Sequence, residues 1–256
     1  MPKATTPRSS PDLQPLRLPG LTGRVAWVTG HRGGIGSEIA SVLEASGCDV
    51  LGLDLPEFDL SDLAGLEERA AQLVQAHGAP RVLVNCAGTT LLGAIPDTSL
   101  ADLQRVMAVN FMAPFLLMKA VLPGMAQAGG GAIVNVASDQ ALIGKPLSAA
   151  YGASKGALAQ LTRSAAIDFG RHKVRVNCIA PGSTDTAMLR EVMESSSRFR
   201  SLFPPPPGVG FRLDSVPLAR LAHPGEIAMA AAFLASDAAS FITGVVLPVD
   251  GGVTAA

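Results

Sequence analysis

Short apolar runs alternate along this chain with longer segments of helical periodicity, and this alternation is the first guide to the fold. Six runs are rich in the branched side chains of buried strands, and they lie at 24–29, 49–54, 81–85, 132–137, 174–179 and 245–250. Helical spacing predicts helices over 36–46, 62–76, 100–125, 148–169 and 224–235. We therefore expect an α/β fold, with an open, doubly wound, mostly parallel seven-stranded sheet and helices on both faces.

The first apolar run leads directly into a glycine-rich turn. Gly30-His-Arg-Gly-Gly-Ile-Gly36 stands between a predicted strand and a predicted helix, the context in which such a motif binds a dinucleotide. Its glycines allow a tight turn and a close approach to a pyrophosphate, and the helix that follows presents its N–H groups. A plain glycine-rich loop is the alternative. With both flanking elements in place, we predict a Rossmann-type site contacted by Gly30, Arg32, Gly34, Ile35 and Gly36.

An acidic residue ends the second predicted strand and bears on the choice of cofactor. Asp54 follows Gly36 by 18 residues, close to the ~20 residues typical of an acid that binds the adenosine ribose hydroxyls. A 2′-phosphate ~4 Å from this carboxylate would cost about 4 kcal/mol per unit charge at an effective dielectric constant near 20. Arg32 in the glycine turn would offset part of that cost. We expect NAD rather than NADP as the cofactor.

A serine, a tyrosine and a lysine follow the fourth apolar run. Ser138 stands at the strand end, and Tyr151 and Lys155 are one helical turn apart, on one face of the next predicted helix. A cation beside a phenol lowers its pKa from the ordinary value of about 10. Taken alone, an incidental Tyr and Lys in a helix would be the better explanation. Because the other predicted ligand contacts also follow strand ends, at one edge of the sheet, we favour an active site.

Composition and charge exclude several other classes of protein. The net charge of −1, with no long run of either sign, argues against partners such as nucleic acid or an anionic membrane. Cys48, Cys86 and Cys178 are isolated, which indicates buried free thiols in a reducing cytoplasm. The cysteine and histidine spacing gives no support to a metal site. No apolar run reaches the ~18 residues that suggest a spanning helix.

The chain is predicted to form one domain after a short tail. Residues 1–19 contain five prolines and are interpreted as a flexible tail, and residues 20–256 as a single dinucleotide-binding catalytic domain. Residues 187–222 break the alternation, and we predict a loop that acts as a substrate lid. The apolar segment 100–125 is expected to be interrupted near Pro114. Asn110 lies inside it, and structural and catalytic roles remain equally open.

At this point the motifs resemble the short-chain dehydrogenase/reductase family over residues 22–253. The matching motifs are Thr29-Gly-x-x-x-Gly-Ile-Gly36, Asn85-Cys-Ala-Gly88, Asn110, Ser138, Tyr151-x-x-x-Lys155 and Pro181-Gly182. Cys86 replaces an asparagine usual in that family, and His31 and Arg32 are not typical of its glycine turn. The resemblance implies hydride transfer between a small-molecule alcohol or ketone and nicotinamide, and a homotetramer built partly from the helix that carries Tyr151.

The resemblance also implies roles for individual residues. Tyr151 would be the general acid/base, and Lys155 would lower its pKa and bind the nicotinamide ribose. Ser138 would orient the substrate oxygen, and Asn110 would hold a water in a proton relay. Beyond the glycine turn, the cofactor contacts that it implies are Asp54, Asp59, Leu60, Asn85, Ala87, Gly88, Pro181, Gly182, Thr184 and Thr186.

Within the family, several stretches are similar to 2,3-dihydro-2,3-dihydroxybenzoate dehydrogenases, and they lie at 136–139, 148–155, 181–188 and 250–254. Such enzymes oxidise a ring hydroxyl of a cyclohexadiene carboxylate. Lys145 is the candidate cation for that carboxylate, and Met188 is a further predicted substrate contact. The alternatives are a sugar-acid dehydrogenase, a 3-oxoacyl thioester reductase that uses NADPH, and a cofactor-binding module without catalysis. Asp54 argues against the reductase, and the complete set of Asn110, Ser138, Tyr151 and Lys155 argues against the module.

Overall fold

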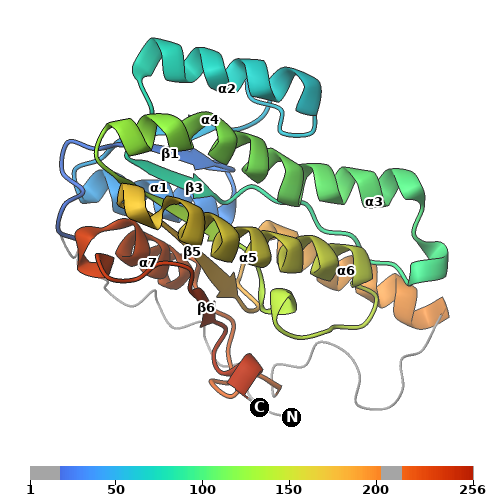
Figure 1. The fold of residues 1–256 in the computed structure, drawn as a ribbon. Helices are drawn as coiled ribbons and strands as arrows, with labels where there is room; N and C mark the ends of the chain where they lie inside the picture. The colour runs from blue at the N-terminus through green and yellow to red at the C-terminus, as the bar shows by residue number, and fades with distance from the viewer. Residues whose placement is uncertain (1–17, 203–214, 256) are drawn as a thin grey trace.

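The structure, a computed structural model, describes residues 18–202 and 215–255 (Figure 1). Six strands of these residues form one parallel sheet in the order β2-β1-β3-β4-β5-β6. The strands are β1 (Val25–Thr29), β2 (Asp49–Leu53), β3 (Val82–Asn85), β4 (Gly131–Val136), β5 (Val174–Pro181) and β6 (Val246–Val249). The predicted fold class is confirmed. The predicted count of seven strands is wrong for the described residues, because only the six apolar runs pair into the sheet.

Helices cover both faces of this sheet (Figure 1). The α-helices are α1 (Gly34–Ala45), α2 (Leu63–His77), α3 (Leu100–Met107), α4 (Ala113–Gln127), α5 (Ala149–Phe169), α6 (Ala187–Leu202) and α7 (Pro224–Ala235). One apolar core joins Ile39 of α1 and Ile227 of α7 to the sheet. The other core joins Leu66 of α2 and Leu117 of α4 to the opposite face. Because both faces are buried, the strands are apolar throughout rather than alternating.

The long apolar segment from Leu100 forms one rod of helix with a defect in the middle (Figure 1). A π-helical turn, Ala108–Met112, separates α3 from α4. The interruption expected near Pro114 has a clear cause: proline has no N–H, so the Asn110 carbonyl loses its ordinary helical donor. The Ala113 N–H bonds to the Ala108 carbonyl, five residues back. Such π-turns are often found at functional sites, and this one carries Asn110.

By length and composition alone, the rod Leu100–Gln127 could cross a membrane, which corrects our expectation that no such segment exists. Its most apolar stretch has a mean hydropathy of 1.7, but half of that stretch is buried inside the fold. Leu117 and Val121 are completely buried in the core beneath α4. The apolar character of the rod is therefore accounted for by packing against the sheet, as in the core helix of a globular domain.

Polar side chains cap the start of two of the predicted helices. The Asp62 carboxylate accepts a hydrogen bond from the Gly65 N–H at 3.2 Å and caps α2. The His223 ring accepts one from the Gly225 N–H at 3.1 Å, and Glu226 accepts one from the His223 N–H at 2.8 Å. This reciprocal pairing satisfies N–H groups that would have no partner inside α7.

Part of the predicted lid is helical. Residues of α6 were expected to be loop, but its first turn contains strong helix formers, and the Thr186 hydroxyl accepts a hydrogen bond from the Leu189 N–H at 3.3 Å. The remainder of the predicted lid includes Pro204–Pro207, which lies outside the described residues, as do residues 1–17 of the predicted tail. Leu18 is buried in the core, and the Pro19 carbonyl accepts a hydrogen bond from the Asp237 backbone N–H.

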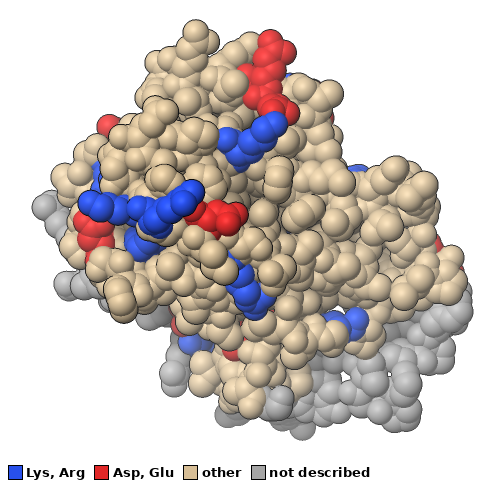
Figure 2. Space-filling model, in the orientation of Figure 1, with Lys and Arg blue, Asp and Glu red and all other residues tan. Residues whose placement is uncertain are grey.

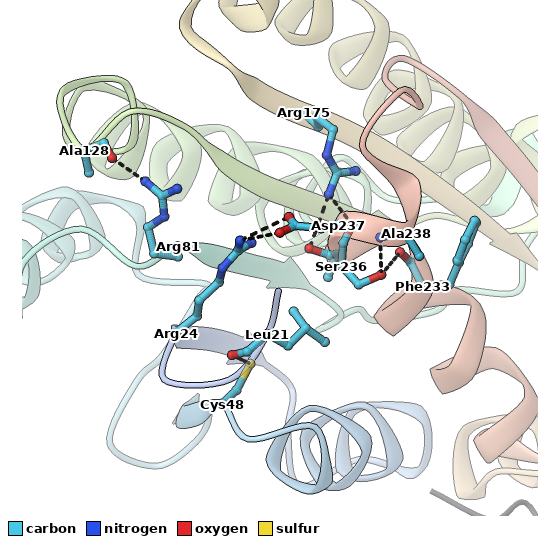
Figure 3. Close-up of polar contacts among 11 residues, drawn as sticks. Leu21, Arg24, Cys48, Arg81, Ala128, Arg175, Phe233, Ser236, Asp237 and Ala238 are labelled. Carbon is cyan, nitrogen blue, oxygen red and sulfur yellow. Dashed lines mark hydrogen bonds and ion pairs between the residues drawn. The ribbon is translucent and has the colours of Figure 1, made fainter. Parts of the chain in front are cut away.

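Arginines hold the amino edge of the sheet (Figure 3). The Arg24 guanidinium, just before β1, pairs with the Asp237 carboxylate at 2.9 Å. Arg81, just before β3, donates to the Ala128 carbonyl at 2.6 Å. Each of these two side chains therefore links the start of a strand to a segment that is distant in the sequence.

Arg175 of β5 closes the carboxyl end of α7 (Figure 3). Its guanidinium donates to the carbonyls of Leu234 at 2.7 Å, Ser236 at 2.8 Å and Ala235 at 3.3 Å. The carbonyls of Leu234 and Ala235 lie in the last turn of α7, where carbonyls have no donor within the helix. Burial lowers the pKa of Arg175, and the ring of carbonyls offsets the cost of holding a charge there.

Candidate active site

A cavity of about 1120 Å³ opens at the carboxyl edge of the sheet, and most of the residues predicted from the sequence line it. They are Gly30, Gly34, Ile35, Gly36, Asp54, Asp59, Leu60, Ala87, Gly88, Ser138, Lys145, Tyr151, Lys155, Pro181, Gly182, Thr184, Thr186 and Met188. The cavity lies where the strand order reverses between β1 and β3, the usual ligand position in a doubly wound sheet. Arg32, Asn85 and Asn110 are not among the lining residues.

Three glycines of the turn after β1 have no room for a side chain. Gly30 has a φ of 68°, and a Cβ there would lie 2.8 Å from the Ala87 Cα. A Cβ at Gly36 would lie 2.0 Å from the Gly30 carbonyl oxygen, and one at Gly34 would lie 2.8 Å from the Thr186 Cγ2. Each position therefore requires glycine for packing or backbone reasons. The result is a bare backbone surface at the cavity wall.

The amino end of α1 faces the same cavity without a side-chain cap. Its N-cap is Gly33, which makes no capping hydrogen bond, and its first turn contains no acidic residue. The N–H groups of this first turn have no partner within the helix. They form a favourable site for a phosphate. The turn and the helix end thus fit the pyrophosphate of a dinucleotide.

Asp54 is held at the edge of this surface by backbone donors. Its carboxylate accepts hydrogen bonds from the N–H groups of Arg32 and Leu55, each at 2.9 Å. The Arg32 guanidinium turns away from the cavity and pairs with Glu57 at 3.0 Å, and it also bonds to the Leu55 carbonyl. Hydrogen bonding, including the bond from Arg32, lowers the pKa of Glu57. The charge of Arg32, the arginine of the glycine turn, is therefore balanced by Glu57.

Asp59 and Leu60 line the neighbouring part of the cavity. The Asp59 carboxylate accepts hydrogen bonds from the Ser61 hydroxyl at 2.7 Å and the Ser61 N–H at 2.8 Å. These bonds lower the pKa of Asp59. Leu60 is buried in the core between β2 and α2. One residue thus presents an anion and the next an apolar surface.

Tyr151 and Lys155 lie on one face of α5, as the spacing predicted. The Lys155 Nζ is 5.7 Å from the centre of the Tyr151 ring and donates to the Val136 carbonyl at 2.9 Å. Lys155 is almost completely buried. The carbonyl that ends β4 thus fixes the ammonium group beside the phenol ring.

Burial dominates the pKa values of Tyr151 and Lys155 in the protein without cofactor or substrate. Burial raises the pKa of Tyr151 to about 12, the Ser138 hydroxyl acts against that rise, and the Asp139 charge adds to it. Burial also lowers the pKa of Lys155 to about 8. The sequence led us to expect that Lys155 would dominate and lower the Tyr151 pKa. In the free site the loss of water outweighs the neighbouring ammonium group.

The Asn110 side chain is fully engaged inside the protein. Its Oδ1 accepts from the Thr89 N–H at 2.8 Å, and its Nδ2 donates to the Thr89 carbonyl at 2.9 Å and the Ser154 hydroxyl at 3.0 Å. The amide therefore joins the π-turn to α5 and to the loop after β3. The structure favours positioning by this side chain, and its role in a proton relay stays a prediction.

Asn85 lies below the cavity, among buried polar groups. It donates to the Asn135 Oδ1 at 2.8 Å, and Asn135 donates to the Thr162 hydroxyl at 2.9 Å. Nearby, the Thr29 hydroxyl accepts from the N–H groups of Cys86 and Ala87, each at 3.0 Å. Asn85 thus supports the cavity from within the sheet, while its neighbours line it.

Ser138 is joined to a buried ion pair. Its hydroxyl donates to the Asp139 Oδ1 at 3.0 Å and accepts from the Gln140 N–H at 3.2 Å. The Lys145 Nζ lies 2.5 Å from the Asp139 Oδ2. Asp139 is 2 % exposed, and the Lys145 side chain is 31 % exposed. Asp139 and Gln140 line the cavity too, and Gln140 was not predicted as a site residue.

The segment after β5 closes the other side of the cavity. The Thr184 hydroxyl donates to the Gly182 carbonyl at 3.1 Å, and Thr186 caps the start of α6. Met188 in the first turn of α6 faces the cavity and is 40 % exposed. Thr89, directly after Gly88, and Arg105 of α3 also line the cavity, and neither was predicted as a site residue. The Arg105 guanidinium donates to the Thr89 hydroxyl at 3.1 Å, a contact between residues that are distant in the sequence.

Three comparisons place this chain among known proteins. A family profile described as enoyl-(acyl carrier protein) reductase matches residues 54–254. A 2-(S)-hydroxypropyl-CoM dehydrogenase of Xanthobacter autotrophicus is 36% identical over 257 residues, which cover 92% of this chain and 98% of the relative. A 2,5-dichloro-2,5-cyclohexadiene-1,4-diol dehydrogenase of Sphingobium indicum is 32% identical over 253 residues, with coverages of 91% and 96%.

A solved structure is similar over the whole domain. It is a protein from Beutenbergia cavernae, provisionally assigned as an NAD(P)-dependent gluconate 5-dehydrogenase, with NADP bound at low occupancy. It has a TM-score of 0.83 and 33% sequence identity, and the match covers 92% of this chain and 98% of that one. The three similar proteins are named as dehydrogenases, and the alcohols that their names give differ. No special similarity to dihydrodihydroxybenzoate dehydrogenases emerges.

Proposed function

The chain belongs to the short-chain dehydrogenase/reductase family and is an NAD(P)-dependent oxidoreductase that acts on hydroxyl groups; within that activity, we propose that it oxidises a secondary hydroxyl of a diol with NAD. The observation that carries this proposal is the group formed by buried Ser138 and Lys155 and partly buried Tyr151 on the wall of the large cavity. This is the arrangement that proton transfer to or from a substrate oxygen requires.

The chain's own residues divide the chemistry among them. The Tyr151 Oη would take the proton of the substrate hydroxyl, and the Ser138 Oγ would orient that hydroxyl. The Lys155 ammonium would stabilise the phenolate form of Tyr151 that accepts this proton, because it is held beside the ring at Val136. The glycine turn, the amino end of α1 and Asp54 fit the cofactor, whose nicotinamide supplies the hydride acceptor when it is bound.

The cofactor preference follows from charges near Asp54. Its carboxylate lies at the cavity edge, and Arg32, which could bind a 2′-phosphate, is occupied by Glu57. We therefore predict NAD over NADP. Asp54→Ala should shift the NAD/NADP ratio of kcat/KM toward NADP by about 10-fold or more, because a repulsive carboxylate is removed. The ratio is measured with one alcohol and both cofactors. An unchanged ratio would mean that another group sets the preference.

The substrate class is supported from two sides. The cavity bears donors and acceptors at Ser138, Asp139 and Lys145, and it has apolar walls near Met188. Among the similar proteins, one is named for a cyclic diene-diol, which keeps a cyclic diol such as the predicted 2,3-dihydro-2,3-dihydroxybenzoate as the first candidate. A sugar acid is the second, favoured by the similar structure named for gluconate.

A substrate screen tests the proposal directly. The full-length protein is incubated with NAD and cyclic diols, linear diols, simple secondary alcohols and sugar acids, and NADH formation is followed by absorbance. We expect turnover with at least one diol. If NAD binds and no alcohol is oxidised in this screen, a cofactor-binding module without catalysis becomes the better description. NADPH-dependent reduction of a 3-oxoacyl thioester alone would favour the reductase alternative.

The assembly is also a proposal. Phe115 of α4 and Ile167 of α5 are large apolar residues that are 47 % and 82 % exposed. Figure 2 shows this side of the molecule with few charged side chains, positive ones beside negative ones. These features support the predicted homotetramer through α5. Light scattering after gel filtration would give the mass, and a monomer would contradict it. Cytoplasmic location stays a prediction from the isolated cysteines.

A further inference from the structure

The most unusual feature of the cavity wall is the buried carboxylate next to Ser138. Asp139 begins a short 3₁₀ turn, Asp139–Ala141, directly after β4. Its two side-chain oxygens have different partners: Oδ1 accepts from the Ser138 hydroxyl, and Oδ2 from the Lys145 ammonium. Both residues of the ion pair line the cavity. The pair therefore lies one hydrogen bond away from the proposed reacting hydroxyl.

A purely structural role accounts poorly for this carboxylate. The turn is already held by backbone bonds, since the Asp139 carbonyl accepts from the N–H groups of Leu142 at 2.9 Å and Ile143 at 3.0 Å. The negative charge also works against the chemistry, because it raises the pKa of Tyr151. A neutral amide could hold the Ser138 hydroxyl as well. The charge at this position therefore indicates contact with a ligand.

The Asp139–Lys145 pair can form further hydrogen bonds with such a ligand. A carboxylate offers about four lone-pair positions and an ammonium three donors. The bonds found for these side chains use two acceptor positions of Asp139 and one donor of Lys145. Both residues line the cavity, where the Lys145 side chain is 31 % exposed and the Asp139 side chain 2 % exposed. A hydroxyl group donates one hydrogen bond and accepts others, so it complements this pair.

The same pair is a poor partner for an anion. The Lys145 charge is balanced by Asp139 at 2.5 Å, so a substrate carboxylate near Lys145 would also approach the buried Asp139 charge. Like charges at close range repel, and more strongly where water is excluded. From the sequence alone, Lys145 was the candidate for a carboxylate. In the structure its balanced charge favours an uncharged group.

We propose that Asp139 and Lys145 together bind a second hydroxyl of the substrate, next to the one that is oxidised, and thereby select vicinal diols over hydroxy acids. This inference rests on the proposed function, because Ser138 links the two positions: it would orient the reacting hydroxyl and it donates to Asp139. The two residues are specificity determinants, while Tyr151 remains the proton-transfer group.

Three matched alcohols test the proposal with NAD: cis-1,2-cyclohexanediol, cyclohexanol and 2-hydroxycyclohexanecarboxylate. For the wild-type protein we expect kcat/KM for the diol to exceed that for cyclohexanol by roughly 10- to 100-fold, since the mono-alcohol leaves polar groups without a partner. Asp139→Asn, which keeps an acceptor for Ser138, should reduce this ratio at least ~5-fold, mainly through KM of the diol.

The third alcohol, 2-hydroxycyclohexanecarboxylate, distinguishes a substrate-binding role of Asp139 and Lys145 from a structural role. Asp139→Asn leaves Lys145 with an unbalanced charge, so the variant should gain kcat/KM for the carboxylate relative to the diol. Lys145→Met should lose the diol preference without that gain. Lys119→Met serves as the control, because it removes a Lys–Glu pair with Glu67 on the exposed surface, away from the cavity. It should leave all three ratios unchanged.

The outcomes distinguish this inference from the function on which it rests. If the wild-type protein oxidises these alcohols but neither substitution changes the ratios, the diol site is wrong and the dehydrogenase stands. If it oxidises none of them and no other alcohol, both fall. Thermal unfolding shows whether each variant is folded; if Asp139→Asn unfolds, the Lys145→Met ratios decide.

Discussion

The two edges of the parallel sheet are built from opposite kinds of residue. At the amino edge, Arg24, Arg81 and Arg175 hold full charges against a carboxylate or backbone carbonyls (Figure 3). At the carboxyl edge the chain places glycines and buried ionisable side chains around a cavity. The first edge consists of groups that satisfy one another. The second leaves hydrogen-bonding capacity for something else.

This difference indicates how to separate stability from chemistry in the molecule. A substitution at the amino edge should change the free energy of unfolding and leave the properties of the folded active site alone. A substitution at the carboxyl edge should do the reverse, and it can even stabilise the fold, because buried ionisable groups are costly to maintain. The following predictions test that separation.

The largest effect is expected at the carboxyl edge. Tyr151→Phe removes the proposed proton acceptor and should lower kcat by about 10² to 10⁴, the usual contribution of general acid–base catalysis. NAD binding and the unfolding temperature should change little, because only a hydroxyl is lost. Steady-state kinetics and cofactor titration give the two readings. A variant that keeps turnover within a few-fold of the wild-type value would refute the assignment.

The second prediction concerns pH and Lys155. Its pKa is about 8 in the folded protein against an ordinary ~10.4, so the unfolded chain binds more protons between these values. Stability should therefore rise with pH from about 8 to 10. Below pH 8 the folded protein bears the full cost of the buried charge, up to about 3 kcal/mol.

A matched variant isolates this contribution. The thiols of Cys48, Cys86 and Cys178 have pKa values raised by burial to about 11 or 12, so they decrease stability as pH rises above about 9. Urea unfolding of the wild-type protein and of Lys155→Met, compared at each pH, cancels them. The advantage of the variant should shrink from pH 7 to pH 10. A difference that does not depend on pH would contradict the buried charge.

The third prediction moves to the amino edge. Arg175→Met keeps an apolar stem but removes the guanidinium donor of the carbonyls of Leu234, Ala235 and Ser236, of which Ser236 keeps a bond from the Ala239 N–H at 3.2 Å. The free energy of unfolding should fall by about 1.5 to 3 kcal/mol, the range for hydrogen bonds to a charged group. The kcat of the protein that remains folded should stay at the wild-type value. A large loss of kcat without a loss of stability would show that the two edges are coupled.

The fold and much of the site could be predicted because their signals are local. The glycine turn, Asp54, and the pairing of Tyr151 with Lys155 depend on spacing within one strand-turn-helix unit or one helix. The Asp139–Lys145 pair could not be predicted as a pair, because it depends on the path of the turn between β4 and α5. The pKa values of Tyr151 and Lys155 were likewise unpredictable, because burial is set by the whole fold.

Two errors show where local patterns mislead. The serines and charged residues of 187–202 suggested a loop, but good helix formers and the Thr186 cap produce α6. The segment 100–125 was predicted to be a long apolar helix, but not one that is apolar enough by length and composition to cross a membrane, as the rod Leu100–Gln127 is. In the first case the residues at the start of the helix decide its structure, and in the second its burial against the sheet explains its composition.

The Thr29 hydroxyl, which accepts from both Cys86 and Ala87, has a consequence for binding. It fixes the distance between the end of β1 and the turn after β3, the two walls between which a dinucleotide would lie. The width of the crevice is therefore fixed when the chain folds, and ligand binding does not have to order its walls. Much of the entropy that a flexible cleft would lose on binding has already been lost. One oxygen atom of a small side chain thus acts as a spacer that makes the site rigid in advance.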